Sequence, residues 1–449
     1  MGDRVPYERV DNRSVVASVY HHFMRVHDRA GNNKRSRAHK MIYIAIIALF
    51  TLSLFGDFQF DDYKWLHQQI MTGNAPYIPA RPIASHILRG CYHIGGLDPF
   101  VYKLMSLLIH LFAIDALLRV AEHFKRGKWA IWLFAIHPIF VSTVAYPIQA
   151  SVMLATGFCA LSFLHWDKRQ FIRSLIFLGL ACASKQNAWL FPAVMFMYEW
   201  GIKQKLPKWP VILAGLLTVE HFVFRQDWLS NYGCRPYSPL DRICTQISIM
   251  PKYASMVLLP HISKYTISHQ IVLHGVWWLS GMIVWGAGLL SLVRHPKAFW
   301  GMLCVTVMLI PEFTITNLEM MFEHRLYLPL AMIVPFVPRI KPRFYAYIAV
   351  ISAWLIIVNL QYQHIWADQE RLWRHTVRIY PESVRANYNL AKLVIKKDPL
   401  EALYRMNKIK TNLDNHHWRC YKEFSMLYRV FYKQDLENGY KSFKDWAEK

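Results

Sequence analysis

Two adjacent carboxylates, Asp61 and Asp62, close the sequence DFQFDD, which begins at Asp57 directly after the first apolar stretch of the chain. Carboxylates placed at a membrane surface are costly unless a function retains them. Neighbouring side chains point in different directions, so one carboxylate can face a cavity while the other binds backbone or a metal ion. The pair equally suits a helix cap, in which Asp61 would cap a helix beginning near Tyr63. A catalytic base and a cap are both open on these residues alone.

Basic side chains occur on what we expect to be the same side of the membrane as the carboxylates. Arg81 lies in an Ala-Arg-Pro turn, Lys185 ends an apolar stretch, and Glu323, His324 and Arg325 directly precede another. Long basic side chains at such places often only reach from apolar surface to water. Lys185 is the hardest to explain in this way, because it separates two apolar stretches with almost no loop.

These residue types together suit one chemistry. A carboxylate can act as a general base toward a hydroxyl nucleophile, and cations can stabilise a departing phosphate. The combination predicts glycosyl transfer from a sugar linked to a lipid phosphate, and the lipid explains why such an enzyme is in a membrane. His137, which precedes Pro138 inside an apolar stretch, is a further candidate, although a histidine there is more typical of packing at a helix kink.

The composition predicts an integral membrane protein. Its membrane helices would have to position the candidate residues. Of the 449 residues, 54% are hydrophobic and 18% are charged, whereas a soluble chain averages about 25% charged. Apolar stretches recur that can cross a hydrocarbon core of about 30 Å, and backbone in lipid must be helical to satisfy its hydrogen bonds. The net charge of +23 comes from short basic clusters between these stretches. This is the positive-inside pattern of a membrane protein, and it excludes a nucleic-acid partner.

The hydrophobic pattern predicts an all-α, polytopic fold with about eleven transmembrane helices. Placing the N-terminus in the cytoplasm makes every short inside loop basic, whereas the short outside connections are poor in Lys and Arg. An odd number of spans then places the C-terminus outside. The predicted spans are Met41–Gly56, Val101–Val120, Trp129–Tyr146, Ile148–Trp166, Phe171–Ser184, Ala188–Ile202, Trp209–Phe224, Ile271–Val293, Phe299–Thr316, Leu326–Pro338 and Phe344–Gln363.

The same pattern divides the chain into three predicted parts. Residues 1–40 form a basic cytoplasmic tail, 41–363 a transmembrane domain, and 364–449 a helical tail on the outer side. Two long outer loops, 57–100 and 225–270, interrupt the transmembrane domain. Within the second loop, the stretch Ile247–Leu259 has the pattern of a helix lying in the membrane interface.

The C-terminal tail has helical spacing interrupted by a proline. In Leu372–Leu393, apolar and small residues recur at helical spacing, Pro381 breaks the pattern, and a second helix is expected near Ser383. The pattern is similar to a junction between tetratricopeptide repeats, with room for one or two repeat units. The alternative is a plain helical hairpin packed on the membrane domain.

Several segments, in their order along the chain, resemble the large membrane glycosyltransferases of the GT-C fold. The likeness is to the transmembrane and tetratricopeptide-repeat protein O-mannosyltransferases and their bacterial relatives. It covers the chain from Met41 to about Leu393. The matching stretches are Phe60-Asp61-Asp62 with Ala80-Arg81-Pro82, His137-Pro138-Ile139 through Val144-Ala145, Ala183-Ser184-Lys185-Gln186, Leu259-Pro260-His261 with Ile262-Ser263, and Glu323-His324-Arg325-Leu326-Tyr327-Leu328-Pro329.

The resemblance implies an inverting transfer from a polyprenyl-phosphate monosaccharide. Asp61 or Asp62 would be the base toward a Ser or Thr hydroxyl of a protein acceptor, such as a pilin or another surface protein. The lipid phosphate would be bound by basic residues, and three further residues could support the site. The implied phosphate-binding residues are Lys185, Arg325, Arg81 and His324, and the supporting ones are Asp57, His137 and Glu323.

The family also implies that no cofactor is required, and no metal is predicted, although a divalent ion is possible. Two features depart from the family. Gln186 stands where the family usually has Glu, which removes a carboxylate, and the repeat array is short. The short array fits a bacterial enzyme in the inner membrane, with its site facing the periplasm.

Three other functions compete with this interpretation. A GT-C enzyme directed at lipopolysaccharide or another glycan would share all of the chemistry. A lipid or sugar transporter would favour polar groups near the bilayer midplane and an inverted repeat, and neither feature is evident in this sequence. A non-catalytic scaffold would use its tail to bind partners.

Overall fold

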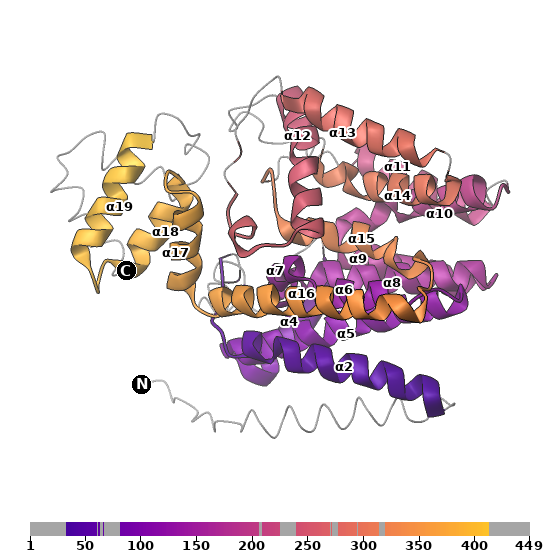
Figure 1. The fold of residues 1–449 in the computed structure, drawn as a ribbon, viewed down its shortest axis with the longest axis horizontal. Helices are drawn as coiled ribbons and strands as arrows, with labels where there is room; N and C mark the ends of the chain where they lie inside the picture. Colours follow the sequence, from indigo (N-terminus) through magenta and orange to yellow (C-terminus); the bar gives the residue numbers. More distant parts are fainter. Residues whose placement is uncertain are drawn as a thin grey trace. The chain divides into compact units, whose positions relative to one another are not determined.

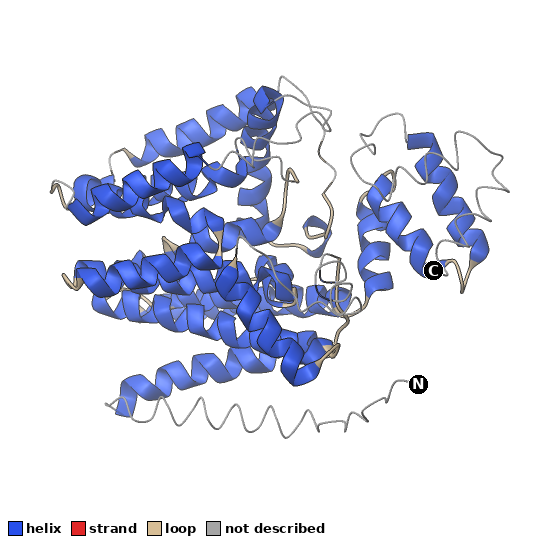
Figure 2. Cartoon of the chain, turned by 180° about the vertical axis from the view of Figure 1, so that it is seen from behind, coloured by secondary structure: helices blue, strands red, loops and turns tan. Residues whose placement is uncertain are grey.

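The structure, a computed structural model, describes residues 33–60, 62, 66, 81–205, 209–224, 239–269, 271, 277–293, 295–313 and 319–412. The chain separates into two units, Met1–Leu49 and Phe50–Lys449. Figure 2 shows that the regular elements of the described residues are helices. The all-α class predicted from the sequence is therefore confirmed for this part of the chain.

The α-helices follow one another in the order shown in Figure 1. They are α2 (Asn33–Leu54), α4 (Pro82–Gly95), α5 (Pro99–His123), α6 (Trp129–Ala135), α7 (Val141–Val144), α8 (Ala150–Asp167), α9 (Phe171–Ser184), α10 (Phe191–Met197), α11 (Trp209–Phe224), α12 (Pro239–Leu258), α13 (Trp277–Leu292), α14 (Pro296–Phe313), α15 (Tyr327–Ala331), α16 (Tyr345–Trp366), α17 (Gln369–Ile379), α18 (Val384–Val394) and α19 (Pro399–Asn412).

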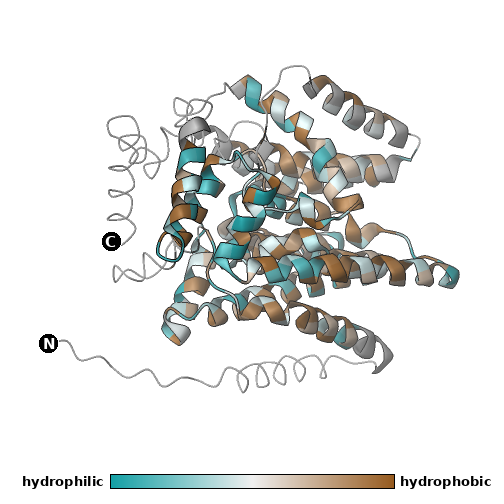
Figure 3. Cartoon of the chain, turned by 60° about the vertical axis from the view of Figure 1, so that its left-hand side comes forward, coloured by the Kyte–Doolittle hydropathy of each residue, from teal (hydrophilic) through white to brown (hydrophobic). Residues whose placement is uncertain are grey.

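Several of these helices are suited to a membrane. Three of the described helical segments, Pro99–His123, Pro147–Asp167 and Pro342–Trp366, are long and apolar enough to cross one. Shorter apolar helices cover His39–Leu54, Phe171–Ser184 and Phe299–Ile310. Most residues of the long helices are hydrophobic, as their brown colour in Figure 3 shows. The chain is therefore an integral membrane protein, while the number of eleven spans stays a prediction.

Three of the predicted spans are not continuous α-helices, which corrects the sequence prediction. Trp129–Tyr146 is divided into α6, a 3₁₀ turn at Pro138–Phe140 and α7. Ala188–Ile202 combines part of a 3₁₀ turn, the short α10 and a π-helical turn, and α15 ends well before Pro338. Proline is the shared cause, because Pro138, Pro192 and Pro335 each lie in the first turn of a new helical element. A proline lacks the N–H that would continue the preceding helix and disfavours α geometry in the residue before it.

Two predicted helix starts also lie further toward the N-terminus in the structure. α2 begins at Asn33, within the part predicted to be a polar tail, and α12 begins at Pro239 and not near Ile247. The first turns of both helices are polar, and apolar residues occur mainly in the later turns. A pattern based on hydrophobicity therefore detects these helices too late along the chain.

Helices α5, α8 and α9 form a packed centre. Asp98 caps α5 by accepting a hydrogen bond from the Phe100 N–H at 3.0 Å, and Pro99 occupies its first turn. Gly157 of α8 allows a close approach, because a Cβ at this position would overlap the ring of Phe112 on α5. The Phe112 and Phe158 rings then lie 5.2 Å apart, edge to face. Regular helices and small residues together produce this packing.

The described part of the tail contains the helices α17, α18 and α19. As predicted, α17 ends before Pro381 and the next helix begins beside Ser383, whose side chain accepts a hydrogen bond from the Ala386 N–H. Asn387 secures the junction by donating to the Pro381 carbonyl at 2.7 Å. The resemblance to tetratricopeptide repeats stays a prediction, because the three helices show a hairpin geometry that many helical proteins share.

Candidate functional site

The acidic loop, residues 56–60 and Asp62 after the first helix, places the side chain of Asp62 inside the protein. Asp62 is fully buried, and its carboxylate accepts hydrogen bonds from the N–H groups of Ile148 at 3.1 Å and Gln59 at 3.4 Å. A carboxylate that accepts backbone N–H groups in this way fixes the loop. Asp62 therefore binds backbone, one of the two roles open from the sequence, while Asp61 lies outside the described residues.

Phe60, directly before the acidic pair, has a strained backbone. Its φ of 42° lies in the left-handed region, which is uncommon for a bulky residue other than glycine. Such conformations cost roughly 1–3 kcal/mol and persist only where the surroundings enforce them. The loop before Asp61 is therefore held in place by its neighbours and not by local preference.

Arg81 connects three separate segments. It lies at the start of α4, and its Nε donates to Gln186 Oε1 at 3.2 Å, while its Nη1 donates to Ser151 Oγ at 3.4 Å. Gln186, the residue that departs from the family pattern, is thus a partner of Arg81. Since an amide oxygen carries no net charge, this hydrogen bond does not neutralise the guanidinium.

Arg81 and Asp62 contact the same turn at the beginning of α8. Asp62 accepts from the Ile148 N–H, and Ser151 Oγ, which receives the bond from Arg81, itself donates to the Ile148 carbonyl at 3.4 Å. Short polar contacts therefore link the acidic loop to Arg81, although long stretches of sequence separate α4 from α8.

The remaining predicted cations are buried and close together. Lys185, His324 and Arg325 are 5%, 9% and 3% exposed. Burial lowers the pKa of His324 well below its ordinary value, and the positive charges of Lys185, Arg325 and Arg81 lower that pKa further. The imidazole is thus neutral at neutral pH, with three cations around it. Together these four residues are called the cation cluster below.

Local structure explains how the cation cluster is presented. Lys185 has an extended backbone that ends α9. His324 and Arg325 lie in a 3₁₀ turn, Glu323–Leu326, before α15. The Phe322 ring stacks on His324 with centroids 5.1 Å apart and lies 5.6 Å from the Arg325 guanidinium. Both segments are breaks between helices, so the side chains emerge from helix ends rather than from a lipid-facing surface.

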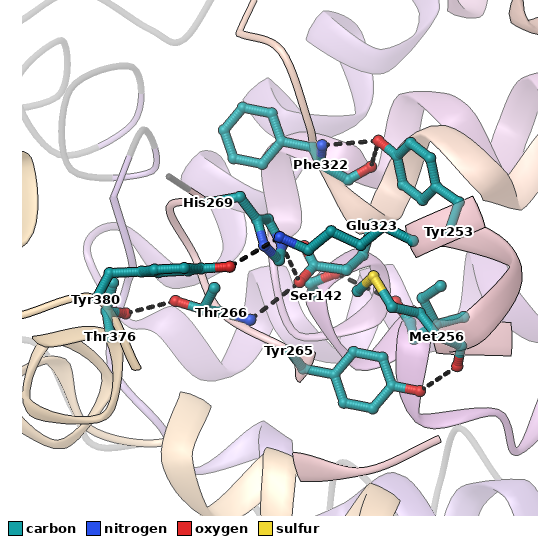
Figure 4. A network of polar contacts seen from close by, with 12 residues as sticks. Ser142, Tyr253, Met256, Tyr265, Thr266, His269, Phe322, Glu323, Thr376 and Tyr380 are labelled. Carbon is teal, nitrogen blue, oxygen red and sulfur yellow. Dashed lines mark hydrogen bonds and ion pairs between the residues drawn. The ribbon is translucent and has the colours of Figure 1, made fainter. Parts of the chain in front are cut away.

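Glu323 belongs to a different network, shown in Figure 4. Its carboxylate is 1% exposed and accepts from His269 Nε2 and from the Thr266 N–H, both at 3.0 Å. Burial, with the Glu323 charge beside it, raises the pKa of the nearby Tyr265 hydroxyl above its ordinary range. Thr266 Oγ1 in turn bonds Thr376 Oγ1 of α17 at 2.9 Å. Glu323 therefore ties the segment of Thr266 and His269 to the turn that carries His324 and Arg325.

His137 serves as a helix cap in the structure. Its Nδ1 accepts from the Ile139 N–H at 3.2 Å, and its Nε2 donates to the Val257 carbonyl at 3.0 Å. Both ring nitrogens are engaged, which fits packing at a kink. Asp57 is exposed, and its N–H donates to the Ala367 carbonyl at 3.0 Å.

Lys103, in the first turns of α5, is a residue that the sequence interpretation passed over. It is 1% exposed, its Nζ has no hydrogen-bond partner among the described residues, and the charges of Asp62 and Asp57 act on it. A Cβ on Gly56 would lie 2.9 Å from the Nζ. A lysine inside an apolar span was itself a signal, because such charges are rarely placed without a function.

A cavity of about 880 Å³ lies beside α15, the helix that begins directly after the cation cluster. Leu330 of α15 and Trp354 of α16 contribute to its wall, and His137, His261 and Lys264 are its basic members. The other side chains in the wall are apolar or aromatic. The cavity therefore suits an apolar ligand.

Comparison with known proteins adds a similarity of fold only. No family model matches the chain, and no curated relative matches it. Among solved structures, the crystal structure of ArnT from Cupriavidus metallidurans bound to undecaprenyl phosphate is similar, with 13% sequence identity and a TM-score of 0.40. The match covers 82% of this chain and 75% of ArnT. Because this similarity is weak, we argue the function from the residues of the chain itself.

Proposed function

We propose that the chain is a membrane glycosyltransferase that moves a monosaccharide from a polyprenyl-phosphate donor to Ser or Thr hydroxyls of a protein acceptor. The observation that carries this proposal is the cation cluster, which gathers Lys185, Arg325 and Arg81 around a neutral His324. Cations of like charge repel one another, and an anion bound among them relieves that repulsion. A phosphate group supplies that anion.

The cluster would stabilise the phosphate as it leaves. The acceptor hydroxyl oxygen attacks the anomeric carbon, the bond from that carbon to the phosphate oxygen breaks, and the electron pair leaves with the polyprenyl phosphate. Arg81, Lys185 and Arg325 neutralise the charge that develops there. Neutral His324 can donate a further hydrogen bond without adding repulsion. Asp61 would accept the hydroxyl proton as general base.

Asp62 would act as the support for this base. Its two backbone hydrogen bonds fix the turn that carries the acidic pair against α8. Arg81 contacts the same turn of α8 through Ser151. This common attachment supports the proposal that base and phosphate-binding groups serve one reaction, because transfer requires both at the same sugar.

The donor lipid would use the apolar cavity. Its wall includes Leu330 on α15, which follows Arg325 after little more than one helical turn, so a phosphate at the cluster and an isoprenoid chain in the cavity are compatible. We place the protein in a bacterial inner membrane with this site facing the periplasm. A protein acceptor fits the helical tail, whose surface can bind an extended peptide.

The first experiment tests the phosphate site directly. Purified protein in detergent is titrated with undecaprenyl phosphate and, separately, with undecaprenol, which lacks the phosphate. Binding of the phosphate alone is expected, and Lys185→Gln or Arg325→Gln should weaken it roughly tenfold or more, as loss of a charge-assisted contact does. Arg173→Gln is the matched control, since Arg173 is exposed on the expected cytoplasmic side. Equal affinity for both lipids would refute the proposal.

The second experiment identifies the acceptor. Intact-protein mass spectrometry of surface proteins from a deletion strain should show loss of a sugar-sized mass, and Asp61→Asn should reproduce this loss while the enzyme still inserts and binds undecaprenyl phosphate. Unchanged protein masses together with an altered glycan would instead assign a glycan acceptor. Full transfer by Asp61→Asn would remove Asp61 from the proposed mechanism.

A further inference from the structure

Arg385 of α18 touches two segments that the proposed reaction needs. Its Nη2 forms an ion pair with Glu319 Oε1 at 2.7 Å. Its guanidinium also lies over the ring of Phe60, 5.6 Å from the centroid. Phe60 directly precedes the acidic pair, and Glu319 lies just before the turn that carries His324 and Arg325. One tail residue thus joins the acidic loop to the segment that leads to His324 and Arg325.

The contact on Phe60 falls where the loop needs external support. Phe60 is the residue with the left-handed backbone, at φ 42°. The Trp373 ring of α17 lies against its ring at 6.0 Å, edge to face, while Arg385 covers it from α18. Because a strained backbone persists only when its neighbours enforce it, these two tail side chains have a direct effect on the loop geometry.

The backbone of the same loop is also bound to the start of the tail. Asp57 N–H donates to the Ala367 carbonyl at 3.0 Å, and Gln59 Nε2 donates to the Trp366 carbonyl at 3.0 Å. Gln369 returns a bond from its Nε2 to the Phe58 carbonyl at 2.9 Å. These contacts hold the backbone of residues 57–59, and the ring of Phe60 contacts Trp373 and Arg385.

The tail reaches the other half of the site through a second route. Thr376 of α17 bonds Thr266, whose N–H donates to Glu323. Lys252 of α12 donates to the Tyr380 hydroxyl at 2.8 Å. The segment 319–325 is therefore held by two sets of contacts. Glu323 binds Thr266 and His269, and Glu319 binds Arg385 of the tail.

We propose that Arg385 is a positioning residue that sets the acidic loop against the cation cluster through Phe60 and Glu319, so that α17 and α18 are part of the active centre. This inference rests on the proposed function for its catalytic meaning. Arg385 acts through other residues and contacts no reacting atom. The tail thereby has a positioning role in the reaction, in addition to any binding of the acceptor.

A charge-exchange experiment tests the bridge. Arg385→Glu and Glu319→Arg each place like charges together and should lower kcat for transfer roughly tenfold. The double variant restores the ion pair, but not the guanidinium over Phe60, and should recover part of the rate. The affinity for undecaprenyl phosphate should stay within about twofold in all three, because the cation cluster itself is intact. This split between kcat and binding distinguishes positioning from general damage.

The matched control exchanges a second ion pair in the same tail. Lys408 and Glu382 are 3.1 Å apart in the tail. Lys408→Glu, Glu382→Lys and their double variant should leave kcat unchanged. Wild-type kcat in Arg385→Glu, or no recovery in the exchanged pair, would overturn the proposal.

Hydrogen exchange provides a readout that does not depend on activity. Peptides covering residues 55–60 and 319–325 should exchange faster in Arg385→Glu. In the exchanged pair the peptides of 319–325 should return toward wild-type rates, while peptides of α8 stay unchanged in every variant. If wild-type protein neither binds undecaprenyl phosphate nor transfers sugar, the proposed function fails but the exchange data still test the bridge. Unaltered exchange in Arg385→Glu would show that the bridge does not exist in solution.

Discussion

The regular helices and the breaks between helices are stabilised in different ways in this protein. α5 and α8 are long and apolar, and small residues such as Gly157 let them pack closely. The polar candidates Asp62, Lys185 and His324 lie instead at turns and helix ends. Backbone that leaves helical geometry within a membrane must be satisfied by protein groups. Polar side chains therefore hold the breaks, while packing holds the helices, and stability measurements can separate the two.

The largest loss of stability is expected at Asp62. Asp62→Ala leaves the N–H groups of Gln59 and Ile148 buried without their acceptor, which should cost about 3 kcal/mol, since each unsatisfied group costs roughly 1–3 kcal/mol. Thermal unfolding in detergent measures the change. Asp62→Asn, which keeps one acceptor oxygen, should lose less. An Asp62→Ala protein that unfolds at the wild-type temperature would contradict a structural role.

A somewhat smaller loss is expected at Glu323. Glu323→Gln removes the charged acceptor of His269 and weakens the bond from Thr266, at a cost of about 2 kcal/mol, in the range of hydrogen bonds to charged groups. Glu382→Gln is the control, because this glutamate is about half exposed in the tail, whereas Glu323 is buried. Equal unfolding temperatures for the two variants would mean that the buried network adds nothing to stability.

Within the regular helices, two glycines should respond in opposite ways. A Cβ at Gly157 would overlap Phe112, whereas nothing lies within 4 Å of a Cβ at Gly179. Gly157→Ala should therefore destabilise the protein by about 1–3 kcal/mol through overpacking, and Gly179→Ala should be neutral or stabilise it by up to about 1 kcal/mol. Calorimetry of both variants checks the sign. Two neutral results would show that α5 and α8 adapt more freely than their close contact indicates.

The smallest effect is expected from His324, as a dependence of stability on pH. The pKa of this buried histidine lies well below its ordinary value. Near and below pH of about 6.5 the unfolded chain binds more protons than the folded protein, so stability is complete above this pH and falls as the pH is lowered. His324→Gln should reduce this fall in Tm, whereas exposed His86→Gln should not. An unchanged pH profile in His324→Gln would contradict the burial of a neutral imidazole.

The helical tail shows which helix boundaries can be predicted from nearby residues in the sequence. The sequence predicted that one helix ends before Pro381 and that the next begins near Ser383, and both features are present. Pro138 was equally visible in the sequence. The prediction nevertheless extended one helix from Trp129 to Tyr146 across this proline, because hydrophobicity alone favoured a continuous helix. Local breakers decide helix ends even inside apolar sequence.

The candidate site was only partly accessible from the sequence. The residue types of Arg81, Lys185 and Arg325 indicated phosphate chemistry, but their common influence on His324 depends on the fold. Lys103 and Arg385 were not selected at all. Each gains its importance from partners far along the chain: Asp57 and Asp62 for Lys103, and Phe60 and Glu319 for Arg385.

The sequence by itself determined that this chain is helical and enters a membrane, because apolar length, prolines and caps act through neighbours along the backbone. Only the tertiary structure decided that Asp62 binds the backbone at Ile148, that Arg81 meets Gln186, and that Arg385 contacts both Phe60 and Glu319. These contacts join residues distant in sequence, and their energies depend on burial and direction. No periodicity or composition encodes either quantity.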